Sequence, residues 1–188
     1  MKKFIVLMLC LSLLIACIPA FAEEAAPRNH ILVVYFSATG TTKGVAEKLA
    51  EGLSADLYEI VPEEPYTDAD LNYNNSKSRT SIETDDPSCR PAIAGELPDL
   101  TGYDTVFIGY PIWWGDVPRI VSNFVEKVDL TNKTLAVFIT SGSSGLGSSM
   151  KHLEQQAGAG TWLEGKRFTS RTTVEELVTW AKGLGIEP

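Results

Sequence analysis

The feature that most constrains the fold is an alternation of short, continuously apolar runs with segments of helical periodicity. Four runs have the composition of strands buried on both faces of a sheet: ILVVYF (31–36), TVFIGY (105–110), TLAVFIT (134–140) and, more weakly, TWLEGKRF (161–168). A fifth run, ADLYEI (55–60), mixes charged with apolar residues and resembles an exposed edge strand. With right-handed crossovers, this alternation predicts a parallel sheet between helices.

Apolar residues that recur on one face indicate the helices between these runs. Four helices are expected. Three of them have an apolar stripe, formed by Val45, Leu49 and Leu53, by apolar residues within 117–128, and by Leu146, Met150, Leu153 and Ala157. The last helix runs from the capping box TTVEE to about Gly183. We expect Asp116 to cap the second helix with Pro118 in its first turn, and His152 to lie off the third stripe in solvent.

These elements predict the α/β class, as a doubly wound three-layer sandwich with a five-stranded parallel sheet. A strand order of 2-1-3-4-5 puts the mixed-polarity strand at the edge of the sheet. In that order the topological switch lies between the first and third strands, and ligands bind at the carboxyl ends of the strands there.

The first 22 of the 188 residues have the features of a secretory signal peptide. Two lysines precede an apolar stretch that is short for a membrane span, and Ala20-Phe21-Ala22 fits a cleavage site. An alternative is the segment LIAC, in which Cys17 resembles the lipid-modified cysteine of a bacterial lipoprotein. Both interpretations predict an exported, extracytoplasmic protein, with residues 23–29 as a tether and residues 30–188 as the folded domain.

Charge and composition exclude several classes of function. Loss of Lys2 and Lys3 with the leader leaves 14 basic and 24 acidic side chains, a net charge of −10, which argues against nucleic acid or anionic lipid as a partner. His30 and His152 are far apart, so no metal site or catalytic triad is expected. Cys89 alone is certain to remain after cleavage; we interpret it as an inert thiol in preference to a catalytic one.

The segment FSATGTTKG (36–44) follows the first apolar run and leads into the first helix. Hydroxyls on Ser37, Thr39, Thr41 and Thr42, together with the amides of a helix N-terminus, favour an anion. The spacing matches neither the triphosphate loop GxxxxGK[ST] nor the dinucleotide fingerprint GxGxxG, which leaves a monophosphate. The alternative is a hydroxyl-rich turn that only caps a helix.

Two further loops are expected at the same edge of the sheet. GYPIWWGDVPR (109–119) places two adjacent tryptophans after the third strand, and their indole faces suit a flat aromatic ligand. Either tryptophan alone could instead be part of the core or of an interface. TSGSSGLGSS (140–149) supplies amides and hydroxyls for the polar edge of a ring, and its glycines permit close approach.

The three loops together resemble those of the flavodoxin family. The phosphate-binding pattern [ST]-x-T-G-x-T is matched at Ser37, Thr39, Gly40 and Thr42, and the resemblance runs from about Ile31 to near the C-terminus. It implies flavin mononucleotide (FMN) as cofactor. The residues it implies are Ser37, Thr39, Gly40, Thr41 and Thr42 on the phosphate; Pro111, Ile112, Trp113, Trp114 and Gly115 along the isoalloxazine; and Ser141, Gly142, Ser143 and Gly145 at its rim.

The resemblance implies an electron carrier whose partners are redox proteins or small-molecule acceptors, with a membrane contacted only through a lipid on Cys17. Two alternatives stay open: an FMN-dependent NAD(P)H:quinone-type oxidoreductase, and a flavin-binding protein without a redox role. The absence of a recognisable nicotinamide site favours the carrier.

Residues 61–103 form a long connection in which 68–79 is a candidate helix and 84–91 a loop. Tyr73, Arg79 and Arg90 either overhang the flavin or are ordinary surface residues.

Overall fold

The computed structural model describes residues 30–187, so the predicted leader, Cys17, the tether and Pro188 lie outside the described residues. The elements are, in chain order, β1 (Ile31–Tyr35), α1 (Thr41–Leu53), β2 (Asp56–Glu59), α2 (Arg79–Asp85), β3 (Thr105–Pro111), α3 (Arg119–Val125), β4 (Thr134–Thr140), α4 (Ser149–Ala157), β5 (Thr161–Trp162), β6 (Lys166–Phe168) and α5 (Val174–Gly183). No helix within residues 30–187 is long and apolar enough to cross a membrane.

All strand pairs are parallel, in the order β2-β1-β3-β4-β5, with β6 also pairing with β4. This confirms the predicted order and the edge position of the mixed-polarity strand. The last predicted strand is divided in two at Glu164 and Gly165, both residue types that are depleted in strands. A Cβ atom on Gly165 would lie 2.6 Å from Cδ2 of Leu146 and 3.0 Å from the backbone oxygen of Val137, so a larger residue would fit at this break only if these neighbours shifted.

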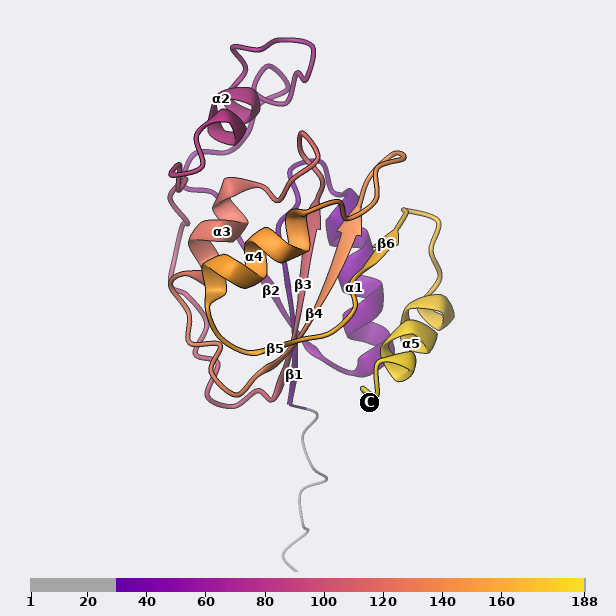
Figure 1. Ribbon diagram of the computed structural model, residues 1–188. Coiled ribbons are helices and arrows are strands. Elements are labelled where there is room, and N and C mark those ends of the chain that lie inside the picture. Colours follow the sequence, from indigo (N-terminus) through magenta and orange to yellow (C-terminus); the bar gives the residue numbers. More distant parts are fainter. Residues whose placement is uncertain (1–29, 188) are drawn as a thin grey trace, which may run out of the picture.

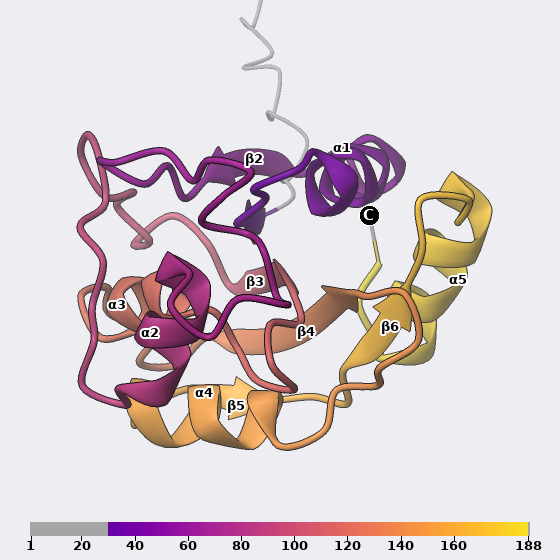
Figure 2. The same ribbon diagram turned by 90° about the horizontal axis from the view of Figure 1, so that it is seen from above.

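Helices cover both faces of the sheet (Figures 1 and 2), and an apolar cluster lies beneath the helices on each face. On one face α1 and α5 bury residues such as Leu49 and Leu177 against Val33 and Phe138. On the other face α3 and α4 bury residues such as Phe124 and Leu153. The apolar runs ILVVY and TLAVFIT are almost wholly buried because both of their faces are covered, which confirms the three-layer sandwich.

Two helices begin later than the sequence predicts. Pro118, in an extended conformation, is the N-cap of α3, so Asp116 is not the cap; the residue before a proline is itself disfavoured in a helix. The helix ends at Val125 and does not reach residue 128. Likewise α4 begins at Ser149, three residues after Leu146. The His152 side chain is 43% exposed, as expected, but its Nδ1 also lies 3.0 Å from Oδ1 of Asp116, a contact that the sequence did not indicate. The capping box of α5 is confirmed at Thr173.

The helix predicted over 68–79 was also wrong, because this part of the connection is a series of turns that precedes α2. Short polar side chains bond locally to the backbone there: the Asp70 carboxylate accepts from the Thr67 amide at 2.9 Å, and the Asn72 side chain from the Asn74 amide at 3.0 Å. Such bonds compete with helical ones. The expected loop at 84–91 is present after its first two residues, which end α2.

The connection is anchored to α3 through three side chains, and Figure 1 shows α2 beyond the carboxyl ends of the strands. Arg119, nearly buried, donates to the carbonyls of Glu83 (3.3 Å) and Thr84 (2.8 Å). Asn123 donates to the Pro91 carbonyl at 2.7 Å. Arg90 makes a two-pronged ion pair with Glu126, with N–O distances of 2.7 and 2.6 Å. The connection is therefore held by specific contacts.

The Arg90–Glu126 pair predicts a pH-dependent contribution to stability. The Arg90 hydrogen bonds lower the pKa of Glu126, so the stabilisation is fully present above the ordinary glutamate range and is lost as the pH falls through the lowered value. Because the Glu126 side chain is 35% exposed, Glu126→Gln should lower the free energy of unfolding by only about 0.5–1 kcal/mol at pH 7.

Urea unfolding at pH 7 and pH 3 measures this difference, which should be smaller at the lower pH. Glu154→Gln, at an exposed position on α4, serves as the control and should have no effect at either pH. An unchanged unfolding energy for Glu126→Gln at pH 7 would show that the pair contributes nothing.

Candidate functional site

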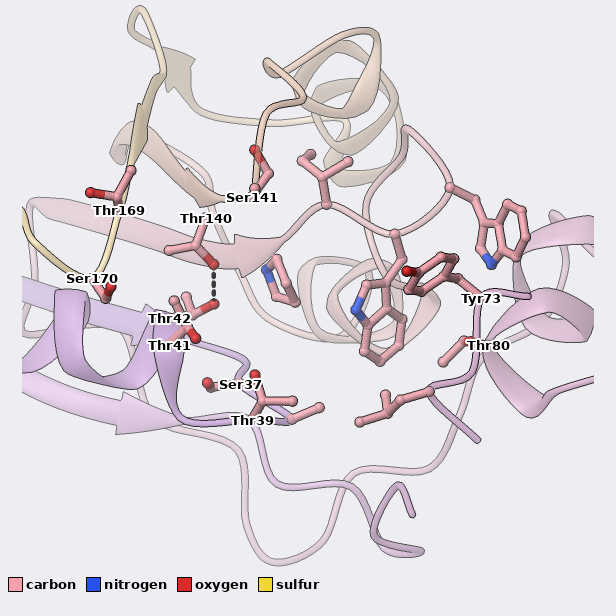
Figure 3. A pocket seen from close by; sticks show the side chains of 17 residues that line it. Ser37, Thr39, Thr41, Thr42, Tyr73, Thr80, Thr140, Ser141, Thr169 and Ser170 are labelled. Atoms are coloured by element: carbon pink, nitrogen blue, oxygen red, sulfur yellow. Dashed lines mark hydrogen bonds between the residues drawn. The ribbon is translucent and has the colours of Figure 1, made fainter. Parts of the chain in front are cut away.

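A cavity of about 720 Å³ opens at the carboxyl ends of β1, β3 and β4 (Figure 3). It is formed by the three predicted loops, by the long connection and by the loop after β6. The lining residues are Ser37, Ala38, Thr39, Thr41, Thr42, Leu71, Tyr73, Thr80, Pro111, Ile112, Trp113, Trp114, Thr140, Ser141, Gly142, Thr169 and Ser170. None of these side chains carries a formal charge, and ten of them carry a hydroxyl group.

The first loop brings an uncapped helix N-terminus to this cavity. Gly40 has a φ of 84°, a conformation that glycine adopts without strain, and α1 begins at the next residue. Among the described residues no side chain caps α1, and its first turn contains no acidic residue. The amides of that turn have no helical acceptor, so the helix presents free donors and a positive dipole end. This arrangement suits an anion.

One predicted phosphate ligand is already engaged within the protein. The hydroxyls of Thr42 and Thr140 lie 2.8 Å apart, and both residues are buried (Figure 3). Thr140 is the last residue of β4, so this bond joins the first loop directly to the start of the third. It fixes the spacing of two loops on either side of β3, and it leaves Thr42 with less hydrogen-bonding capacity for a ligand than Ser37, Thr39 and Thr41 have.

The second loop is a tight turn at a strained residue. The amide of Trp113 donates to the carbonyl of Asp116 at 3.1 Å, and the amide of Asp116 donates back at 2.9 Å. The two central residues, Trp114 and Gly115, have φ values of 51° and 77°. Positive φ at both positions defines a type I′ turn, which tryptophan enters only at a cost of about 1–3 kcal/mol. Trp114 is nevertheless 51% exposed at the cavity, so core packing does not account for it.

The two tryptophans have different surroundings. Trp113 packs edge-on against Phe36 (centroids 5.3 Å apart) and against Tyr66 of the connection (5.0 Å). Burial and a hydrogen bond to Glu83 raise the pKa of Tyr66, so its phenol stays protonated near neutral pH. Trp113 therefore lines the cavity as part of an aromatic cluster, and the core interpretation raised for a single tryptophan applies to it. It does not apply to Trp114.

The third loop is fixed by an arginine that the sequence did not single out. Arg167 of β6 donates to the Ser141 hydroxyl (2.9 Å) and to the carbonyls of Ser141 (3.0 Å) and Gly142 (2.8 Å). The Ser141 hydroxyl also donates to the carbonyl of Ser144. Ser141 and Gly142 line the cavity, whereas Ser143 and Gly145 do not.

The long connection forms the opposite wall. Tyr73, 72% exposed, lines the cavity together with Thr80, and Figure 3 shows both across from Ser37 and Thr39. Arg79 and Arg90 are elsewhere. Arg79 pairs with Glu83 at 2.6 Å and lies 4.0 Å from the centre of the Tyr66 ring, and Arg90 binds Glu126. Of the three residues considered as overhanging a ligand, only Tyr73 reaches the cavity.

Ten of the fourteen predicted cofactor residues line this one cavity. Gly40 and Gly115 lie outside the lining but set the backbone of their turns. The lining residues that went unnoticed in the sequence are Ala38, Leu71, Thr80, Thr140, Thr169 and Ser170. Thr169 follows the last strand, so the rule that ligands meet the carboxyl ends of parallel strands could have found it.

The other chemistry-bearing residues lie apart. Cys89 is half-buried outside this cavity, and desolvation raises the pKa of its thiol, which disfavours the reactive thiolate. Within residues 30–187 no group of three or more histidine, cysteine, aspartate or glutamate side chains could hold a metal ion.

Comparison with known proteins decides the family. The sequence profile of the flavodoxins matches residues 30–184. The chain belongs to the flavodoxin family. A protein from Bacteroides eggerthii DSM 20697 that is assigned as a flavoprotein is 45% identical to this flavodoxin, with a TM-score of 0.79 over 84% of this chain and 98% of that chain. A similar assigned flavoprotein from Bacteroides uniformis ATCC 8492 is 41% identical, with a TM-score of 0.77 over 81% and 97%.

A more distant flavoprotein, from Lactobacillus acidophilus NCFM, was solved in complex with FMN. It is 24% identical to this flavodoxin, with a TM-score of 0.60 over 73% of this chain and 91% of that chain, and so shows the shared fold. None of the curated proteins matches the sequence.

The two tryptophans of this flavodoxin should respond oppositely to substitution in the flavin-free protein. Trp113→Ala removes the centre of an aromatic cluster and should lower the free energy of unfolding by about 3 kcal/mol. Trp114→Gly relieves the strained turn and should leave that energy unchanged or raise it by about 1 kcal/mol. Urea unfolding of both variants measures the contrast. Equal losses for the two variants would show that Trp114 is a structural residue.

Proposed function

We propose that this flavodoxin carries electrons between redox partners outside the cytoplasm, with FMN as its redox centre. FMN is the cofactor that family membership identifies, and the L. acidophilus flavoprotein of the same fold was solved with it. The observation that carries the proposal is the pairing, in one cavity, of an uncapped helix N-terminus surrounded by hydroxyls with an exposed indole held in a strained turn.

The residues present fit FMN at both ends of the cavity. Ser37, Thr39 and Thr41 would bind the phosphate with the amides at the start of α1, and Gly40 shapes that turn. Ile112, Trp113 and Trp114 would contact the isoalloxazine, while Ser141 and Gly142 would face its polar rim. The carbonyls of Ser141 and Gly142 already accept from Arg167, so the loop is positioned without help from a ligand.

When bound, FMN supplies the electron-transfer chemistry, and the chain sets its affinity, access and potential. The uncharged lining offers no cation to offset additional negative charge at the ring, which favours a low reduction potential. Trp114 covers part of the cavity while staying half exposed, so electrons can leave near the surface.

The same lining favours a carrier over a nicotinamide-dependent enzyme. A nicotinamide dinucleotide brings additional phosphate groups, and no lysine or arginine among residues 30–187 lines the cavity to receive them. One observation supports the alternative of a quinone-type oxidoreductase: Leu71 and Tyr73 add an apolar wall against which a small planar acceptor could lie.

The extracytoplasmic location rests on the predicted leader. Mass spectrometry of the mature N-terminus tests it, with Glu23 or a lipid-modified Cys17 as the expected first residue.

Redox titration of the FMN-loaded protein tests the carrier. We expect reduction in two separated one-electron steps, the second at a low potential, and negligible oxidation of NADH or NADPH with or without an added quinone. Rapid NADPH oxidation that depends on the quinone would establish the oxidoreductase instead. A protein that binds FMN but exchanges no electrons with small mediators would have no redox role.

A further inference from the structure

The loop that connects β6 to α5 contributes two hydroxyls to the cavity, although no predicted binding motif includes it. Thr169 and Ser170 line the cavity together with the first loop. We propose that residues 169–170 form a fourth cofactor loop, in which the hydroxyls of Thr169 and Ser170 bind the phosphate of FMN. This inference rests on the proposed function, since it assumes that FMN occupies the cavity.

The topology of the sheet puts this loop at the phosphate end of the cavity. β6 runs parallel to β4, and Phe168 pairs with Thr140 in the register. Thr140 in turn bonds to Thr42 of the first loop at 2.8 Å. Thr169 therefore leaves the sheet one residue beyond the point where the first and third loops are joined. Figure 3 shows Thr169 and Ser170 on the same side as Thr41 and Thr42, whereas Tyr73 and Thr80 are at the opposite end.

The backbone of this loop is fixed to the helix that begins at the first loop. Lys48 of α1 donates to the carbonyls of Ser170 (3.2 Å) and Thr172 (2.9 Å). The loop closes on itself through the Thr172 amide, which donates to the Thr169 carbonyl at 3.0 Å. Because α1 carries both the first loop and Lys48, the two hydroxyl groups are held in register with the helix N-terminus. Little ordering of residues 169–172 would therefore accompany the binding of FMN.

The ordinary explanation for a Ser/Thr-rich segment before a helix is capping, and here capping uses other residues. The Thr173 hydroxyl accepts from the Glu176 amide at 3.2 Å, which completes the capping box of α5. The Thr172 hydroxyl accepts from the Thr169 amide at 3.1 Å. The side-chain hydroxyls of Thr169 and Ser170 have no hydrogen-bond partner within residues 30–187. Two residues that line a site suited to an anion thus carry uncommitted hydroxyl groups.

The chemistry favours the phosphate over the ring as their target. The hydroxyl of Thr42 shares a hydrogen bond with that of Thr140, so part of the hydrogen-bonding capacity of the first loop is already used within the protein. A phosphate group has three terminal oxygens, each able to accept more than one hydrogen bond. Donors from a second loop on the other side of α1's first turn would complete its shell without adding a charge.

Affinities for FMN and for riboflavin, measured by flavin fluorescence titration, test the proposal. Thr169→Val and Ser170→Ala should each weaken FMN binding about tenfold while changing riboflavin binding less than about twofold, because riboflavin lacks the phosphate. Thr179→Val, an exposed position on α5 away from the cavity, is the matched control and should change neither affinity. Thr172→Val, which breaks the loop's own bond, should lower the melting temperature.

The outcomes separate this inference from the proposed function. Equal weakening of FMN and riboflavin, or no change in either, with unaltered melting temperatures would overturn the role of Thr169 and Ser170 while leaving FMN binding intact. An unmutated protein that binds no FMN would instead remove the proposed function itself, and this inference with it.

Discussion

Parallel pairing of β1, β3 and β4 is the constraint on which the rest of the structure depends. It brings the carboxyl ends of three strands to one edge, so segments distant in sequence become walls of one cavity. The buried Thr42–Thr140 bond then joins the loops after β1 and β4 across the end of β3. A phosphate-binding helix start and an aromatic turn can therefore be held at a set spacing before any cofactor arrives. Preorganisation of this kind raises affinity because less ordering accompanies binding.

The cavity is also where the fold departs from ideal local structure. Trp114 is held in a backbone conformation that suits glycine, and its indole is left half exposed. Nearby, Arg119 is nearly buried and contacts Asp116 of the same turn as well as the end of α2. The strained turn and the long connection are thus supported by one side chain.

The sequence was sufficient for the sheet but not for the connection. Runs such as ILVVY are buried on both faces, so their composition indicated a parallel sheet, and the mixed polarity of residues 55–60 indicated which strand lies at its edge. The predicted helix over 68–79 failed because Asp and Asn side chains bond to nearby backbone amides there, and apolar periodicity does not reveal that competition. Thr80 and Leu71 line the cavity only because of the path that the connection takes. Arg167 of β6 bonds to the loop after β4, which is distant in the sequence. No sequence pattern near these residues indicates their roles.

Discrimination between FMN and riboflavin by the unmutated protein tests the central claim most directly, because the two ligands differ only in the phosphate. If the uncapped start of α1 and its surrounding hydroxyls bind that group, isothermal titration calorimetry should show FMN binding at least about 100-fold more tightly, as expected for two or more hydrogen bonds to a charged group. Equal affinities for the two flavins would contradict the account, since the loop would then be only a hydroxyl-rich helix start.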